Sequence, residues 1–189
     1  MSVSTVDHPL LLALLRYWQT KCFGQAMPAR RDIDPVEMGP ALLPHLLLGD
    51  LLDRGTRVRF RLVGTIAVKR LGFDPTGKYL EPGVKGGYFD LLASLHRLVY
   101  CERAPLYSES EFAWGSRRQL VARHLLLPLA QDGPEPSIAL VGLVVSSDEV
   151  FPPPLRALGD GAAHRELCRI AVPPLTASDP EQDTDRIVA

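Results

Sequence analysis

The sequence predicts an α+β fold built on a five-stranded antiparallel sheet. Five segments in the middle of the chain have the composition of strands, and most of them are joined by short turns containing Gly or Pro. Segments with helical periodicity precede the strands and separate the second from the third. The chain has 189 residues, which suits one domain with extensions.

Charge and cysteine content exclude several classes of protein. The chain has 21 Lys and Arg against 22 Asp and Glu, so it lacks the basic field used to bind nucleic acid or anionic membranes. Its three cysteines, Cys22, Cys101 and Cys168, are far apart and lack metal-type spacing. We therefore expect a cytoplasmic protein without a disulfide framework or a metal site, in which Cys101 is a core thiol.

The most apolar N-terminal stretch is too short to cross a membrane. It runs for six residues, from Leu10 to Leu15, before Arg16 interrupts it, whereas a spanning helix needs roughly 20. Asp7 precedes the run, where a secretory signal would place positive charge. We expect neither a membrane span nor an export signal.

Two helices are predicted before the first strand. Over residues 9–23, Leu11, Leu14 and Trp18 recur at helical spacing, which predicts an amphipathic helix that covers its own core or forms a dimer interface. A second, short helix is predicted over 35–42. Asp34 can cap it, Pro35 suits its first position, and Glu37 is spaced as in a capping box.

The first two strands form a hairpin. Residues 45–52 and 57–63 flank the turn "DRGT". In the second strand apolar residues alternate with arginines, so one face is expected to be apolar and the other polar, with Val58, Phe60 and Leu62 opposite Arg57, Arg59 and Arg61.

Two helices and three strands follow. Residues 65–72 predict a short helix and residues 87–102 a longer one. The strands are 105–112, 118–129 and 137–146, of which the first alternates with charged residues and the last is apolar on both faces. Charged strands suit edges and doubly apolar strands suit the middle of a covered sheet. The predicted order is therefore 57–63, 45–52, 137–146, 118–129, 105–112, or 2-1-5-4-3, with the helices between strands on one face and the N-terminal helix on the other.

The chain divides into three predicted regions. Residues 1–44 form a helical extension, 45–147 the sheet-and-helix core, and 148–189 a Pro-rich tail whose end we expect to be disordered.

An ordered set of short motifs resembles one known family. These motifs are Tyr17-Trp18, "MPARRDIDP" (27–35), "LLP" (42–44), "RLVGT" (61–65), "TGKYL" (76–80) and "LLLPL" (125–129). Together with the strand order they resemble the stand-alone bacterial PAS-domain proteins, over about residues 8–147. The resemblance implies a sensory or regulatory module rather than an enzyme, binding a small molecule or a protein partner and signalling through a separate protein.

In PAS domains the ligand pocket generally lies between the sheet and the helices that follow the second strand. Carried onto this chain, the resemblance implies a pocket at Val58, Phe60 and Leu62 of the second strand, with Phe89, Leu92 and His96 of the long helix.

The resemblance also raises the question of cofactors. Haem-binding PAS proteins take an axial histidine from the long helix, which would be His96 here, but a lone helical histidine is more often an ordinary buried or surface residue. Photosensory PAS domains carry a reactive cysteine in an "N-C-R-F-L-Q" helix, which this sequence lacks. We expect neither haem nor flavin, and the ligand stays unidentified.

A polar group is predicted where the N-terminal extension meets the sheet. Asp32 has Arg30 beside it in sequence, and Arg61 projects from the polar side of its strand. A buried carboxylate needs a partner, so we expect Arg61 to pair with Asp32. The group either pins the extension to the sheet, which we favour, or binds a polar ligand.

We expect the PAS-type sensor to be a homodimer. Two other functions are possible for this sequence. One is a small α+β enzyme acting on a hydrophobic substrate, for which His96 and His124 are the only plausible bases. The other is an interaction module with a filled core and no ligand.

Overall fold

The computed structural model describes residues 6–80, 87–114, 118–131, 133–147, 152–155 and 163–171. The helices are α1 (Pro9–Thr20), α2 (Pro35–Leu42), α3 (Thr65–Leu71) and α4 (Gly87–Glu102). The strands are β1 (Leu46–Leu52), β2 (Arg57–Val63), β3 (Tyr79–Leu80), β4 (Leu106–Trp114), β5 (Arg118–Ala130), β6 (Pro136–Ser147) and β7 (Ala163–Ala171).

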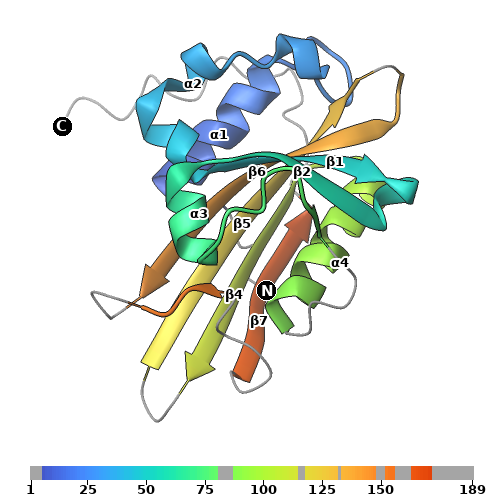
Figure 1. Ribbon diagram of the computed structural model, residues 1–189. Coiled ribbons are helices and arrows are strands. Elements are labelled where there is room, and N and C mark those ends of the chain that lie inside the picture. Colours follow the sequence, from blue (N-terminus) through green and yellow to red (C-terminus); the bar gives the residue numbers. More distant parts are fainter. Residues whose placement is uncertain are drawn as a thin grey trace, which may run out of the picture.

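The strands form a single sheet whose order is β3-β2-β1-β6-β5-β4-β7 (Figure 1). All its pairings are antiparallel. The predicted order of the five long strands is confirmed, because β2-β1-β6-β5-β4 is its central part.

The prediction that strands 57–63 and 105–112 are edges is wrong. The two-residue strand β3 pairs with β2, and β7, from the predicted tail, pairs with β4. One charge of β4 is neutralised by the neighbouring strand: Glu109 pairs with Arg123 of β5, with 3.1 Å between Oε1 of Glu109 and Nη2 of Arg123. A charged strand can thus be an inner strand when its neighbour supplies the opposite charge.

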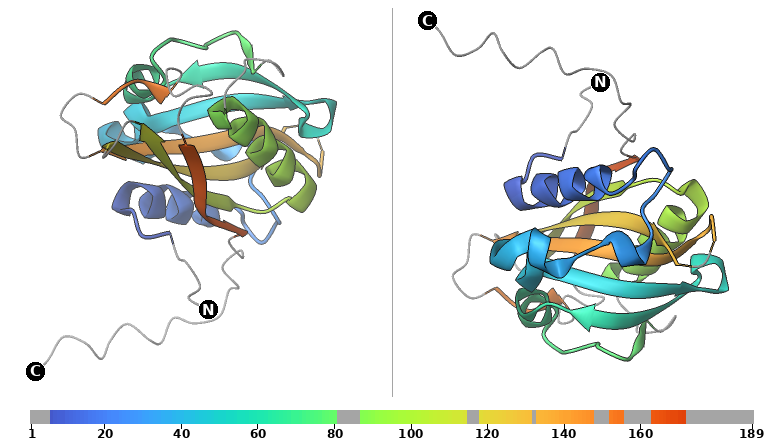
Figure 2. Two further views of the ribbon diagram at one scale, coloured as in Figure 1. Left: turned by 90° about the horizontal axis from the view of Figure 1, so that it is seen from below. Right: turned by 90° about the horizontal axis from the view of Figure 1, so that it is seen from above.

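Helices cover the sheet on both sides (Figure 2). We call the side covered by α1 and α2 the outer face and the side covered by α3 and α4 the inner face. Each side has its own core of buried apolar residues. The predicted covering of both faces is confirmed.

Helix α1 packs very closely on the outer face. Its Trp18 is fully buried and donates an indole hydrogen bond of 2.9 Å to the carbonyl oxygen of Pro128 in β5. A side chain at Gly142 of β6 would place its Cβ 2.7 Å from a methyl carbon of Leu11 and 2.8 Å from one of Leu14, so both leucines would have to shift. The helix therefore covers the sheet of its own chain.

The start of helix α2 is as predicted except for the capping box, because the backbone N–H of Asp34 donates to the hydroxyl of Tyr17, at 2.8 Å, and not to Glu37. Asp34 caps the helix, with a carboxylate oxygen accepting a 2.8 Å hydrogen bond from the backbone N–H of Val36, and Pro35 takes the first position. Glu37 makes an ion pair with Lys21, at 2.5 Å. This ion pair connects α2 to the end of α1.

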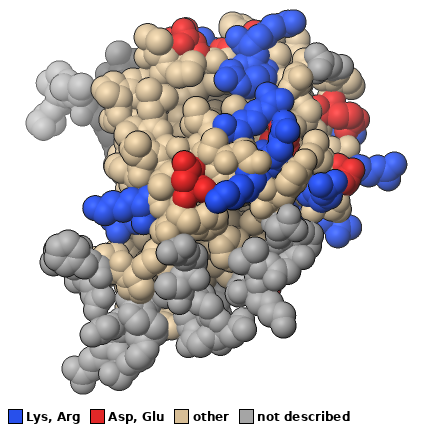
Figure 3. Space-filling view, in the orientation of Figure 1, with Lys and Arg blue, Asp and Glu red and all other residues tan. Residues whose placement is uncertain are grey.

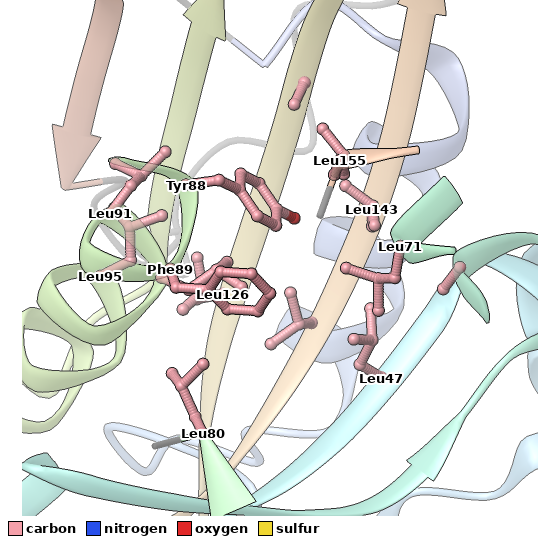
Figure 4. Packing of buried hydrophobic residues seen from close by; sticks show 14 of the residues in the cluster. Leu47, Leu71, Leu80, Tyr88, Phe89, Leu91, Leu95, Leu126, Leu143 and Leu155 are labelled. Atoms are coloured by element: carbon pink, nitrogen blue, oxygen red, sulfur yellow. The ribbon is translucent and has the colours of Figure 1, made fainter. Parts of the chain in front are cut away.

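The inner core lies between α4 and the middle of the sheet (Figure 4). Leu91, Leu95 and Val99 are buried at helical spacing along α4. Cys101 lies off this stripe and is exposed, so the prediction of a core thiol there is wrong. In the described parts of the chain, no helix combines the length and the apolar character needed to cross a membrane.

A bulge in β2 changes which residues share a face. Leu48 of β1 pairs with Leu62, but Gly49 pairs with Phe60, so Arg61 is the extra residue. A bulge reverses the alternation of side chains beyond it. Val58 and Phe60 are buried in the inner core, whereas Leu62 is 51% exposed beside the outer face, near α2.

Candidate functional site

Five buried polar side chains lie on the inner face, and we call them the core polar cluster: Tyr88, His96, Ser108, Ser110 and His124. Each of them is at most 1% exposed. Tyr88 and His96 lie on the buried stripe of α4. Ser108 and His124 are directly paired across β4 and β5, and alternation along β4 puts Ser110 on the same face as Ser108.

Hydrogen bonds orient both histidine rings. The Tyr88 hydroxyl lies 3.0 Å from Nε2 of His124. Nδ1 of His96 lies 2.7 Å from the carbonyl oxygen of Leu92, one turn earlier in α4. Because a carbonyl only accepts, Nδ1 carries the proton, which leaves Nε2 of a neutral His96 as an acceptor.

Four polar atoms of the cluster have no hydrogen-bond partner among the described residues. They are Nε2 of His96, Nδ1 of His124 and the hydroxyl oxygens of Ser108 and Ser110. Leaving a buried polar group unpaired costs about 1–3 kcal/mol. Each of these groups needs a partner that the described residues do not supply, such as a buried water molecule or a polar group of a ligand.

Both rings are held neutral. Burial lowers the pKa of His96, against the smaller opposing effect of its hydrogen bond to Leu92. Burial, with a contribution from His96, lowers the pKa of His124 to about 3. Burial likewise raises the pKa of Tyr88, so the cluster carries no charge near neutral pH.

An apolar cavity of about 320 Å³ lies next to the cluster. We call it the aromatic cavity; its lining is Phe60, Phe73, Pro75, Lys78, Tyr79, Leu80 and Phe89. The Phe60 ring stands edge-on to His96 at 6.4 Å between centroids, and the Phe89 ring stands edge-on to Tyr88 at 5.8 Å. Phe60 and Phe89 therefore form the wall between cavity and cluster, and Figure 4 shows Tyr88 and Phe89 side by side at the start of α4.

The structure brings together five of the six predicted pocket residues. Phe60 and Phe89 line the aromatic cavity, and Val58, Leu92 and His96 are buried in the inner face. Leu62 does not join them, because the bulge at Arg61 turns it away. The prediction that Leu62 shares a face with Phe60 is therefore wrong.

The predicted pairing of Asp32 with Arg61 is also wrong. Asp32 accepts a 3.1 Å hydrogen bond from the backbone N–H of Ala29 and so closes its own turn, Arg30–Asp32. Arg30 donates to the carbonyl oxygen of Ile33 at 3.2 Å. Arg61 instead pairs with Asp50 of β1, with 2.5 Å between Nε and Oδ1.

Asp50 is a buried carboxylate that sequence reasoning missed. Its side chain is 7% exposed, and its second oxygen accepts hydrogen bonds from Nη2 and Nε of Arg59 at 2.9 and 3.2 Å. It lies in a polar cavity of about 530 Å³ that includes Gln131 and Glu135. Figure 3 shows basic side chains gathered, with acidic ones among them, on the side that carries β1 and β2.

A signal for Asp50 was present in the sequence. It is the single charge in the apolar strand "HLLLGDLL", opposite the arginines of the next strand. A buried charge requires a partner, and the hairpin supplies two.

The described residues contain no group of three or more His, Cys, Asp or Glu side chains placed to hold a metal ion. The expectations that neither haem, through His96, nor flavin is bound stay predictions.

Comparison with known proteins gives one match. The family model described as a PAS domain matches residues 6–145 of the chain. This confirms the resemblance to PAS-domain proteins, and the match includes α1, α2 and the five long strands β1, β2, β4, β5 and β6 up to residue 145, but not β7. No curated protein and no solved structure matches the chain.

Proposed function

Because the chain belongs to the PAS-domain family, we propose that it is a sensory or regulatory module that binds a small molecule on the inner face. In this proposal the ligand occupies the aromatic cavity and reaches the core polar cluster. Binding changes the packing of α4 on the sheet, and a separate protein reads that change.

The observation that carries this proposal is the position of the unpartnered polar atoms. They belong to the buried cluster whose His96 and Tyr88 rings pack edge-on against Phe60 and Phe89, two residues that line a cavity of about 320 Å³. Ligand sites are commonly apolar cavities of about 300–1,000 Å³ with a few convergent polar groups. A purely structural core would gain stability by replacing those polar groups with apolar ones.

One observation favours an enzyme as the second candidate. His124 has a polar neighbour, Tyr88, in hydrogen-bond contact, which is the arrangement that a catalytic base needs. However, a histidine whose pKa is lowered to about 3 is a weak base near neutral pH. The cluster is therefore better suited to hydrogen bonding than to proton abstraction.

Native mass spectrometry of freshly purified protein tests the binding proposal. The wild type is expected to retain a small molecule, and Leu80→Trp, which fills the aromatic cavity, is expected to lose it. Phe23→Trp is the matched control, because Phe23 is 74% exposed and belongs neither to the cavity lining nor to the dimer surface proposed below. A wild type without added mass, together with no binding of small aromatic probes, would favour the interaction module with a filled core.

The homodimer and the cytoplasmic location are parts of the same proposal. Since α1 packs on its own sheet, we expect a second subunit to contact the exposed apolar residues Val36, Leu43 and Leu62. Light scattering after chromatography should show a dimer that Leu62→Glu converts to a monomer; an unchanged dimer would exclude this surface. The free thiols of Cys22 and Cys101 agree with a reducing compartment.

A further inference from the structure

The core polar cluster offers a fixed set of hydrogen-bonding groups. A neutral Tyr88–His124 pair carries two polar hydrogens and uses one of them in its own hydrogen bond. Whichever residue donates, one donor remains, either Nδ1–H of His124 or the Tyr88 hydroxyl. Nε2 of His96 is an acceptor, because Nδ1 of the same ring donates to Leu92. The cluster thus presents both a donor and an acceptor.

The serines extend this capacity without adding charge. The hydroxyls of Ser108 and Ser110 are buried and unpartnered, and each can donate or accept. The described hydrogen-bond partners of the two histidine rings are the Tyr88 hydroxyl and the Leu92 carbonyl, both neutral. An ionised group placed here would lose its hydration without gaining a counter-charge, which is very costly.

Among the described residues, cations lie at the aromatic cavity rather than in the cluster. One is Arg57, whose Cζ lies 4.8 Å from the centroid of the ring of Tyr79, a residue of the cavity lining. Nζ of Lys78 lies 5.9 Å from the centroid of the Phe73 ring, and Lys78 belongs to the cavity lining. An anionic ligand would therefore be held at the cavity by Lys78 rather than at the cluster. This gives a competing class of ligand that can be tested.

The cavity sets the size of the apolar part. A cavity of about 150 Å³ holds benzene, so about 320 Å³ accepts an aromatic body of one or two rings. Its walls, Phe60 and Phe89, touch the cluster residues His96 and Tyr88 on their far sides. For the end of a ligand in the cavity to reach the cluster, these two rings have to move aside.

We propose that the site takes a neutral ligand with a compact aromatic or apolar body that ends in a group able both to donate and to accept hydrogen bonds, such as an amide or an alcohol. This inference rests on the proposed function, since it names the chemistry of the ligand bound at that site. The body lies in the aromatic cavity, and the polar end is bound by His96, Ser108 and the Tyr88–His124 pair.

Three probes of similar size separate the possibilities: benzamide, toluene and benzoate. Titration calorimetry or ligand-detected NMR is carried out at about pH 7.5, above the ordinary histidine pKa of about 6.5. Benzamide is expected to bind at least about tenfold more tightly than toluene, since it gains hydrogen bonds to groups otherwise unpaired. Benzoate is expected to bind more weakly than benzamide.

Two variants test which residues cause the preference for benzamide over toluene. Ser108→Ala and His96→Leu should each reduce the preference for benzamide over toluene to about threefold or less, while toluene still binds. Retained binding of toluene also shows that the variant is folded. Ser137→Ala is the matched control, because its hydroxyl oxygen is also buried and unpartnered but belongs to the polar cavity beside Asp50.

The outcomes distinguish this inference from the proposed function. Toluene binding as tightly as benzamide, benzoate binding most tightly, or unchanged selectivity in both variants would overturn the inference and leave a ligand-binding module. No saturable binding of any probe up to about 5 mM, a range in which fragment-sized ligands are detected, would overturn both.

Discussion

The hydroxyl of Tyr88 and Nε2 of His124 lie 3.0 Å apart in the fully buried interior, joining the first turn of α4 to the middle of β5. The planes of the two rings are tilted by 38° to each other, with 5.7 Å between their centroids. This contact connects α4, which lies beside the aromatic cavity, to the sheet. A substitution at either residue should therefore affect the packing of both elements.

Removing the hydroxyl should destabilise the protein through this contact. Tyr88→Phe leaves both ring nitrogens of His124 without a partner, and we expect the free energy of unfolding to fall by about 1–3 kcal/mol. Urea unfolding followed by circular dichroism measures this. Tyr100→Phe is the control, because the hydroxyl of Tyr100, on the same helix, has no hydrogen-bond partner among the described residues. It should change stability much less, and equal losses would contradict the role of the Tyr88 hydroxyl.

Acid should destabilise the protein below the ordinary histidine pKa. In the native state burial holds His124 neutral down to about pH 3 and also lowers the pKa of His96, whereas the unfolded chain takes up protons near pH 6.5. The free energy of unfolding therefore falls as the pH falls from about 6.5, by up to about 1.4 kcal/mol per unit for each ring.

His124→Phe should weaken this pH dependence, as measured by urea unfolding at several pH values. His45→Gln, which changes a half-buried histidine outside the cluster, should keep the dependence of the wild type. A variant His124→Phe with the full wild-type dependence would show that the ring is not the group responsible.

Because of the bulge at Arg61, substitutions at two neighbouring apolar positions of β2 should lower stability by very different amounts. Phe60→Ala empties part of the inner core and should cost about 3–5 kcal/mol, whereas Leu62→Ala, at a half-exposed side chain, should cost less than about 1 kcal/mol. Only Phe60→Ala should also alter the binding of aromatic probes. Comparable losses at the two positions would mean that both side chains face the inner core.

The buried carboxylate of Asp50 should contribute more to stability than the exposed carboxylate of Asp53 in the same hairpin. Asp50→Asn removes the negative charge between Arg59 and Arg61, and because those arginines are 46% and 39% exposed, we expect a loss of only about 1–2 kcal/mol. Asp53→Asn, whose ion pair with Arg57 is exposed on both sides, should change stability by less than about 0.5 kcal/mol. Chemical denaturation measures both, and the reverse order would refute this view of the hairpin.

The local sequence determined most of the helices, the strands and their order. Asp34 and Pro35 specify the start of α2 because capping depends on neighbouring residues alone. The order of the five long strands followed from hairpin lengths and from which strands are apolar on both faces. These signals are carried by residues close together in the chain, so they can be read without the fold.

The tertiary structure decided which residues meet. Tyr88 and His124 are 36 residues apart, and their contact depends on how α4 lies across the sheet. The partner of Arg61 and the exposure of Leu62 both depend on one extra residue in the ladder between β1 and β2. Strand alternation cannot reveal such a bulge, since a shift of one residue exchanges the two faces while the sequence pattern stays the same.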